Sequence, residues 1–107
     1  MFCGIKTDYG AIGVDATRNA TNSAQGNITS FMDWAQSEGK RTGIVTTTRI
    51  THATPASTYA HIYNRDWECD SEIPQESRGQ FADIARQLVE NSPGNRLWAE
   101  VYYPWVL

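Results

Sequence analysis

The apolar positions of the chain take first a strand-like and then a helical spacing. Glycines bracket an apolar pair at 10–14, which indicates a short strand, and the polar stretch 15–26 predicts a surface loop. A helix face follows, with Asn27 as its N-cap and Gly39 as its C-terminal stop, made by Ile28, Phe31, Met32 and Ala35. The stretch 43–48 is short and β-branched, which is typical of a buried strand.

Beyond this strand the pattern predicts two more helices. Thr54 followed by Pro55 is a helix-start signal, because a hydroxyl caps the backbone and proline fits the first helical position. Residues 64–77 are irregular. A last helix is predicted over 79–90, and its inward-facing residues are Phe81, Ile84, Ala85 and Leu88. The order helix, strand, loop, helix, helix favours the α/β class. One clear strand is too little for a sheet, so we expect a piece of a larger α/β sandwich.

Composition and charge narrow the classes of function. The 107 residues are 40% hydrophobic and 20% charged, which is typical of a globular chain of one domain at most. Nine Lys and Arg against twelve Asp and Glu leave a net charge of −3, so we expect no nucleic-acid partner and no polybasic membrane patch. We also expect no transmembrane helix, since no apolar run reaches about 18 residues, and no signal peptide at the N-terminus.

Familiar catalytic and metal-binding motifs are missing from the sequence. It has no P-loop and no serine in a G-x-S-x-G elbow, and His52 and His61 are too far apart to be the i, i+4 pair of a zinc-protease helix. The two cysteines, Cys3 and Cys69, allow one disulfide but form no C-x-x-C pair. This count argues against zinc-finger and thioredoxin-type sites.

One constellation does suggest binding chemistry. The strand that ends near residue 48 leads to His52 and Thr54, and ligands of α/β sheets bind at the carboxyl ends of strands. The helix predicted from Pro55 directs its positive end the same way, and Arg65 follows with a side chain suited to phosphate. Together these features favour an anionic, metal-bound ligand. The simpler alternative is a core histidine, a helix cap and a solvated arginine, and spacing alone favours that alternative.

At these same residues the sequence resembles the animal-type alkaline phosphatases. The matching stretches keep the family's order and cover about residues 2–96. They are Cys3-Gly4-Ile5-Lys6, Tyr9-Gly10-Ala11-Ile12-Gly13-Val14, Ala16-Thr17-Arg18, Gly43-Ile44-Val45-Thr46-Thr47-Thr48-Arg49, His52-Ala53-Thr54-Pro55-Ala56, Tyr59-Ala60-His61, Asn64-Arg65 and Asp83-Ile84-Ala85. The resemblance implies an alkaline-phosphatase-like sandwich, a central mixed sheet flanked by helices, of which this chain holds about one central strand and three helices.

The resemblance also implies an activity and a role for particular residues. The family hydrolyses phosphate monoesters through a phosphorylated serine, with two zinc ions and one magnesium ion. Arg65 matches the arginine that clamps the phosphoryl oxygens, and Thr54 matches a hydroxyl ligand of magnesium. His52 matches a residue beside the magnesium ion that reaches it through water. Arg49, in the same motif, is expected to be a surface or structural arginine.

The chain also departs from the family. The family's nucleophilic serine lies just upstream of the Cys3 motif and its zinc ligands lie elsewhere, so neither is in this sequence. We therefore divide the chain into 1–96, a partial alkaline phosphatase domain, and 97–107, a tail unlike the strand and glycine-rich turn expected there. The isolated chain is expected to be inactive. The alternative function is a non-catalytic truncated chain that only binds anions or a partner.

The resemblance finally implies where the parent enzyme would work. Members of the family are homodimers held at the cell surface by a lipid (GPI) anchor, although this chain shows no anchor signal. Sequons begin at Asn19 and Asn27, which makes both candidates for N-glycosylation in a secreted protein. Cys69 matches no position of the family, and Phe81 stands where vertebrate members have a disulfide cysteine.

Overall fold

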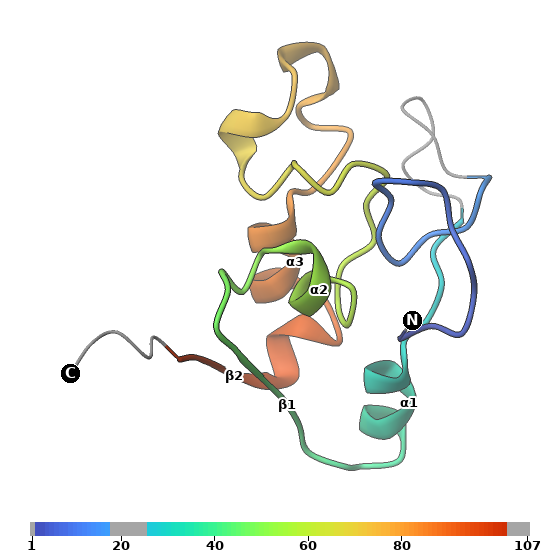
Figure 1. The fold of residues 1–107 in the computed structure, drawn as a ribbon, viewed down its shortest axis with the longest axis vertical. Helices are drawn as coiled ribbons and strands as arrows, with labels where there is room; N and C mark the ends of the chain where they lie inside the picture. The colour runs from blue at the N-terminus through green and yellow to red at the C-terminus, as the bar shows by residue number, and fades with distance from the viewer. Residues whose placement is uncertain (1, 18–25, 103–107) are drawn as a thin grey trace.

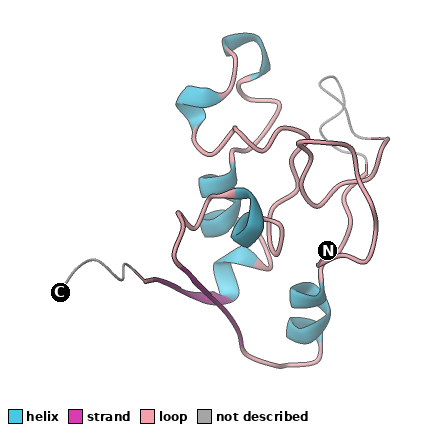
Figure 2. Ribbon diagram, viewed as in Figure 1, coloured by secondary structure: helices cyan, strands magenta, loops and turns pink. Residues whose placement is uncertain are grey.

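The computed structural model describes residues 2–17 and 26–102, which form short helices around one pair of strands (Figures 1 and 2). The elements in chain order are α1 (Phe31–Ser37), β1 (Thr42–Thr46), α2 (Ala53–Ala56), the 3-10 helices η1 (Asp70–Glu72) and η2 (Gln75–Ser77), α3 (Ile84–Glu90), the 3-10 helix η3 (Gly94–Arg96) and β2 (Leu97–Val101). Figure 1 places η1 and η2 at the end of the molecule opposite the strands. No helix in these two ranges is long and apolar enough to cross a membrane.

Helix α1 begins at a capping box three residues later than predicted. The Ser30 hydroxyl accepts a hydrogen bond from the Met32 N–H at 3.1 Å, and the Asp33 carboxylate accepts one from the Ser30 N–H at 2.8 Å. Asn27 is therefore not the N-cap. The predicted stop is confirmed: Gly39, at φ +72°, ends the helix because a left-handed residue is needed there.

The strand predicted over 43–48 is confirmed as β1, and it has a partner. Strand β2 runs parallel to β1, with Thr42 opposite Leu97 and Thr46 opposite Val101. Residues 97–101 of the tail are thus part of the fold, and the strand count is two rather than one. The expected strand at 10–14 is replaced by two isolated bridges, Ile12 with Ile62 and Val14 with Asn27.

Helix α2 is a single turn, which differs from the longer helix predicted from Pro55. It starts at Ala53 with His52 as N-cap, so Thr54 lies inside the turn rather than capping it. The hydroxyls of Ser57 and Thr58 donate back to the carbonyls of Thr54 and Pro55 at 2.6 and 2.7 Å. Such local side-chain bonds compete with helix continuation, and the chain leaves the helix at this point.

Helix α3 also begins later than predicted, at Ile84 instead of residue 79. Its N-cap is Asp83, whose carboxylate accepts a hydrogen bond from the Arg86 N–H at 2.6 Å. Burial and the neighbouring Asp70 carboxylate raise the pKa of Asp83. Ile84 is buried as predicted, and Phe81 is buried in the loop before the helix.

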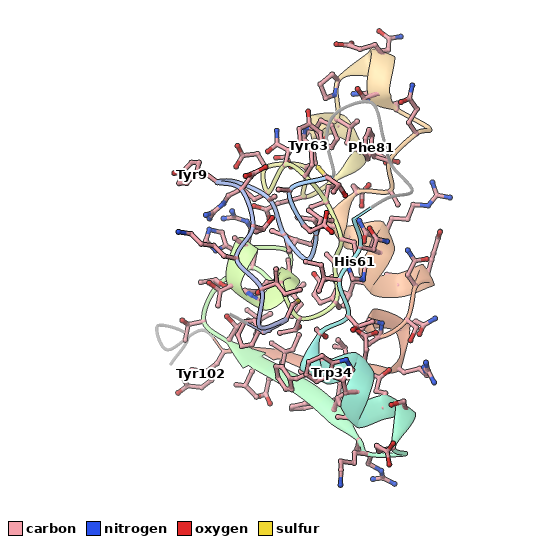
Figure 3. The ribbon with its side chains drawn as sticks, turned by 90° about the vertical axis from the view of Figure 1, so that its right-hand side faces the viewer. Tyr9, Trp34, His61, Tyr63, Phe81 and Tyr102 are labelled. Carbon is pink, nitrogen blue, oxygen red and sulfur yellow. The ribbon has the colours of Figure 1, made fainter. Side chains whose placement is uncertain are left out.

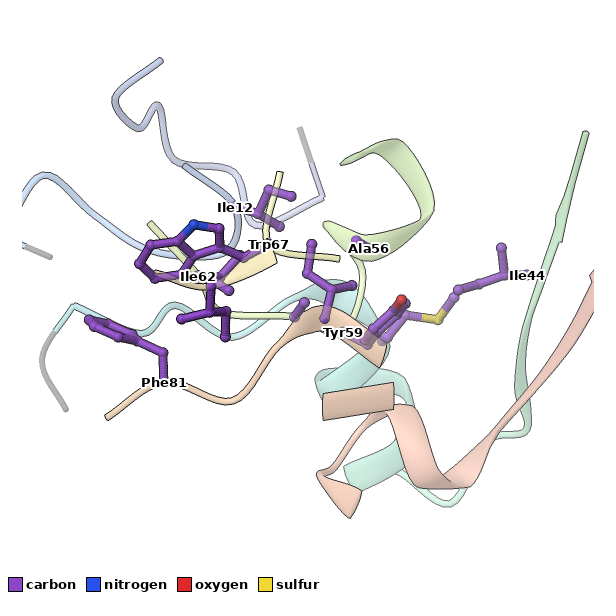
Figure 4. Packing of buried hydrophobic residues seen from close by; sticks show 11 residues of the cluster. Ile12, Ile44, Ala56, Tyr59, Ile62, Trp67 and Phe81 are labelled. Atoms are coloured by element: carbon purple, nitrogen blue, oxygen red, sulfur yellow. The ribbon is translucent and has the colours of Figure 1, made fainter. Parts of the chain in front are cut away.

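The hydrophobic core joins the loops to the strand pair (Figure 4). At one end Trp67 packs edge-on against Phe81 and Tyr63, with ring centroids 5.2 and 4.9 Å apart. At the other end, the buried side chain of Ile44 brings β1 into the same cluster. The remaining buried members are Ile12, Met32, Ala56, Tyr59, Ala60, Ile62, Ile73 and Ile84.

The N-terminal loop is held against residues 60–65 by its backbone. Ile12 and Ile62 exchange hydrogen bonds at 2.8 and 2.9 Å, and the Arg65 N–H donates to the Gly10 carbonyl at 2.7 Å. Gly13 has φ +61°, and a Cβ there would collide with the Ala60 carbonyl oxygen. Glycine at position 13 therefore lets the N-terminal loop approach closely to Ala60 and His61.

Candidate functional site

Two adjoining hollows lie between the N-terminal loop and the segment around residue 65; Arg65 lines both, and α2 lines only the smaller. The larger, of about 650 Å³, is also lined by the carboxylates of Asp8 and Asp66. The smaller, of about 220 Å³, is lined by Thr54 and Ser57 and by no acidic residue. Tyr9, which also lines the larger hollow, projects outward from the N-terminal loop (Figure 3). In the smaller hollow, Arg65 is therefore lined up with hydroxyl-bearing residues and with no acidic one.

Arg65 and Arg49 have different environments. Arg65 is half-buried, and its side chain forms no ion pair with any residue that the structure describes. The guanidinium of Arg49 instead bonds both carboxylate oxygens of Glu68, at 2.9 and 2.7 Å. Paired in this way, Arg49 is already neutralised, as expected of a structural arginine. Of these two arginines, Arg65 is the one that the described residues leave able to bind an anion.

The structure brings Thr54 and Arg65 together but leaves His52 aside. Thr54 is exposed, and its hydroxyl makes no hydrogen bond to a described residue, so it can bind a ligand in the smaller hollow. His52 is half-buried at the N-cap of α2, where its N–H donates to the Arg49 carbonyl at 2.9 Å. His52 is not among the described residues that line either hollow. Because α2 is only one turn long, we do not expect its N-terminus to contribute to anion binding, in contrast to the prediction from the sequence.

The charged link between Arg49 and Glu68 was not anticipated from the sequence. The Thr51 hydroxyl also donates to the Glu68 carboxylate, at 2.6 Å. The hydrogen bonds from Arg49 and Thr51 lower the pKa of Glu68 to about 2, and the nearby charges of Arg49 and His52 act in the same direction. The three donors lie 17 and 19 residues from Glu68 in sequence, so no local motif signals the contact.

The described residues alone do not fit a complete metal site. Within 2–17 and 26–102, no three His, Cys, Asp or Glu side chains gather closely enough to hold a metal ion. The hydroxyl of Thr54 is suited to be one oxygen ligand of a hard cation such as Mg²⁺, which keeps several ligands of other origin. The described residues therefore offer one hydroxyl oxygen but no metal site of their own.

Other candidate residues are placed as follows. Asn27 is exposed, as a glycosylation site requires, and Asn19 lies outside the described residues. Cys3 and Cys69 are both free thiols, so the disulfide that two cysteines allow is not formed. Burial raises the pKa of Cys3, and Cys69 is exposed with its Sγ 3.1 Å from the Ser71 Oγ.

Comparison with known proteins points to one family whose model matches most of the chain. A model of the alkaline phosphatase family matches residues 1–96. Alkaline phosphatase 4 of Drosophila melanogaster is 72% identical over 96 residues, which are 90% of this chain and 16% of the fly protein. The membrane-bound alkaline phosphatase of Bombyx mori is 42% identical over 101 residues, which are 88% of this chain and 18% of the silkworm protein. The chain thus spans less than a fifth of these relatives.

A solved structure agrees with the sequence comparisons. The alkaline phosphatase from the Antarctic bacterium TAB5 aligns with a TM-score of 0.56 and 25% sequence identity. The alignment covers 94% of this chain and 36% of the bacterial chain. The short helices and the parallel strand pair are therefore similar to part of the α/β fold of that enzyme.

Proposed function

The chain belongs to the alkaline phosphatase family, and on this premise we propose that it is the segment of a metal-dependent phosphomonoesterase that clamps the phosphate group. Arg65 is the clamp: its planar guanidinium donates two hydrogen bonds to non-bridging phosphoryl oxygens. Relatives that share the segment are named alkaline phosphatases, and the matched stretch is only 16% and 18% of their length. The nucleophile and most metal ligands would come from those other parts.

A single observation carries the proposal. Arg65 has no ion partner among the described residues and lines a hollow of about 220 Å³ with Thr54, whereas Arg49 is fully paired with Glu68. An arginine held by its backbone but left unpaired in a hollow favours binding of an anion such as phosphate. The hydrogen bond from the Arg65 N–H to Gly10 fixes the main chain from which the side chain extends.

Thr54 is proposed to provide one oxygen ligand of the family's magnesium ion. Its exposed hydroxyl lies in the same hollow as Arg65, so a metal held there would be close to the bound phosphate. His52, two residues earlier, is proposed to act on that metal through water rather than by direct contact. When bound, the metal ions of the family supply Lewis-acid chemistry at the phosphoryl group.

A segment exchange tests the proposal. In the chimeric enzyme, the 96-residue stretch of Drosophila alkaline phosphatase 4 that matches this chain is replaced by the corresponding part of this chain. We expect the chimeric enzyme to hydrolyse an aryl phosphate, and Thr54→Ala in it to raise the magnesium concentration needed for half-maximal activity. A stable, folded chimeric enzyme without phosphatase activity would contradict the proposal.

The alternative function, anion binding without turnover, is proposed for the 107-residue polypeptide alone. Its described residues contain no group of three metal-ligating side chains, but they do contain the unpaired Arg65. The purified polypeptide is expected to show no hydrolysis of an aryl phosphate above background. Zinc-dependent turnover by a preparation free of host phosphatase would overturn this expectation.

The parent enzyme is proposed to work at the cell surface. A relative from Bombyx mori is named a membrane-bound alkaline phosphatase, and Asn27 is exposed in an Asn-Ile-Thr sequon. Glycosidase treatment of the enzyme purified from its native membrane should shift the mass of the peptide that contains Asn27. Detection of this peptide only in its unmodified form would refute glycosylation at Asn27.

A further inference from the structure

The carboxylate of Glu68 joins two segments that are distant in sequence. It accepts hydrogen bonds from Arg49 Nε at 2.9 Å, from Arg49 Nη2 at 2.7 Å and from Thr51 Oγ1 at 2.6 Å. The side chain of Glu68 is 18% exposed, whereas that of Arg49 is 67% exposed. The contact is therefore a partly buried carboxylate on which three donors from one loop converge, with the two-pronged geometry that fixes direction as well as distance.

Glu68 is itself anchored to the core of the molecule. Its carbonyl accepts a hydrogen bond from the Ala85 N–H, and the carbonyl of Trp67 accepts one from the Ile84 N–H, both at 3.1 Å. The Trp67 ring is wedged edge-on against Phe81. The main chain at Glu68 is thus fixed to the start of α3, and its side chain holds the 49–51 loop to that rigid part.

The proposed ligands of phosphate and magnesium stand just beyond each end of this link. Thr54 follows Thr51 by three residues, and Arg65 precedes Glu68 by three residues. The hydrogen bond from the His52 backbone N–H to the Arg49 carbonyl closes the turn that leads into α2, on which Thr54 lies. A displacement of the 49–51 loop would therefore move Thr54 relative to Arg65 across the smaller hollow.

We propose that Glu68 is a positioning residue: through Arg49 and Thr51 it holds the turn that carries Thr54 against the segment that carries Arg65. The inference rests on the proposed roles of Thr54 and Arg65 in the preceding section. An ordinary exposed ion pair contributes little to stability, but catalytic groups lose much of their effect when misplaced by about 1 Å. Glu68 is accordingly expected to affect catalysis more than unfolding.

A double-mutant cycle in the chimeric enzyme tests the inference. Glu68→Ala is made alone and together with Arg65→Ala, and the measured quantities are kcat/KM and inhibition by inorganic phosphate. Glu68→Gln, which keeps the size of the side chain, is the second variant, and the midpoint of heat inactivation is followed for each. The matched control is Glu90→Ala, which breaks the exposed ion pair with Arg86 at 2.8 Å on α3.

We expect Glu68→Ala to lower kcat/KM and weaken phosphate inhibition about tenfold, with Glu68→Gln intermediate and Glu90→Ala unchanged. In the Arg65→Ala background, Glu68→Ala should change phosphate inhibition less than about twofold, because the placement of Thr54 relative to the Arg65 guanidinium no longer matters once that guanidinium is removed. Unchanged kinetics for Glu68→Ala, or an equal loss in both backgrounds, would overturn the inference while leaving Arg65 as the clamp. Phosphate inhibition unaffected by Arg65→Ala alone would overturn the proposed function, and this inference with it.

Discussion

The buried side chain of Gln87 binds both backbone groups of His61. Its Oε1 accepts a hydrogen bond from the His61 N–H at 2.8 Å, and its Nε2 donates to the His61 carbonyl at 3.3 Å and to the Ala82 carbonyl at 2.9 Å. The Nδ1 of His61 lies 2.8 Å from the Gly13 carbonyl oxygen, so His61 links α3 to the N-terminal loop (Figure 3). One amide side chain thus pairs with a segment much as a neighbouring strand would.

Replacing Gln87 is therefore expected to destabilise the fold around the site. Gln87→Ala removes the hydrogen bonds from its side chain to the half-buried backbone of His61 and to the Ala82 carbonyl, which costs about 1–3 kcal/mol. Gln87→Glu keeps the acceptor but loses both donors, and it should be at least as damaging because the carboxylate is also buried. The midpoint of heat inactivation of the chimeric enzyme measures both effects. The exposed Gln80, changed to Ala, is the control, and equal midpoints for the Gln80 and Gln87 variants would refute the prediction.

The link at Glu68 should also depend on pH. Its carboxyl has a pKa near 4.5 when unfolded and about 2 when folded, so the folded state favours the ionised form. The contribution of Glu68 to stability is therefore complete above about pH 4.5 and disappears as the pH falls toward 2. Because Arg49 is largely exposed, its ion pair with Glu68 contributes little to global stability. We therefore expect the effect of pH to be confined to the 49–51 loop and its neighbours.

Amide hydrogen exchange in peptides that cover 49–56 measures this pH dependence. After correction for intrinsic exchange rates, protection should fall below about pH 4.5 in the chimeric enzyme. In the Glu68→Gln variant, protection should already be low at neutral pH and should vary less as the pH falls. Identical pH profiles for the two proteins would count against a link that depends on the ionised carboxylate.

The outer face of the strand pair leads to a prediction about the isolated polypeptide. Val45 is 68% exposed and Trp98 is 59% exposed, and β1 has a strand on only one of its edges within the described residues. Open edges and exposed apolar side chains favour pairing with other chains. We expect the 107-residue polypeptide to self-associate, and Val45→Lys to reduce the association measured by light scattering. A monomer with a sharp cooperative melting transition would argue against this expectation.

Much of the fold could be predicted from local patterns, and the errors have identifiable causes. Strand β1 and the end of α1 at Gly39 follow from β-branched residues and from a glycine that can adopt a positive φ. The sequence pattern places the N-cap at Asn27, whereas the helix begins at the Ser30–Asp33 capping box, which is also a local signal. Strand β2 was missed because its partner lies some fifty residues earlier, at Thr42–Thr46.

The candidate site was predictable only in part. Arg65 and Thr54 were identified from family motifs, and the structure adds that they line one hollow. The helix that would have strengthened the site stops after one turn, because Ser57 and Thr58 bond back to its carbonyls. Glu68 was not anticipated, since its contact with Arg49 exists only once the chain has folded.

The central claim, that Arg65 clamps the phosphate group, is tested most directly by inorganic phosphate inhibition of the chimeric enzyme carrying Arg65→Ala. Hydrogen bonds to charged groups are worth about 1.5–3 kcal/mol each, so inhibition should weaken by roughly tenfold to a few hundredfold. Arg65→Lys, which keeps the charge and loses the planar fork, should fall between. Arg86→Ala, which removes an exposed arginine of α3, should leave inhibition unchanged. Phosphate inhibition that is equally strong with and without the Arg65 side chain would contradict the account.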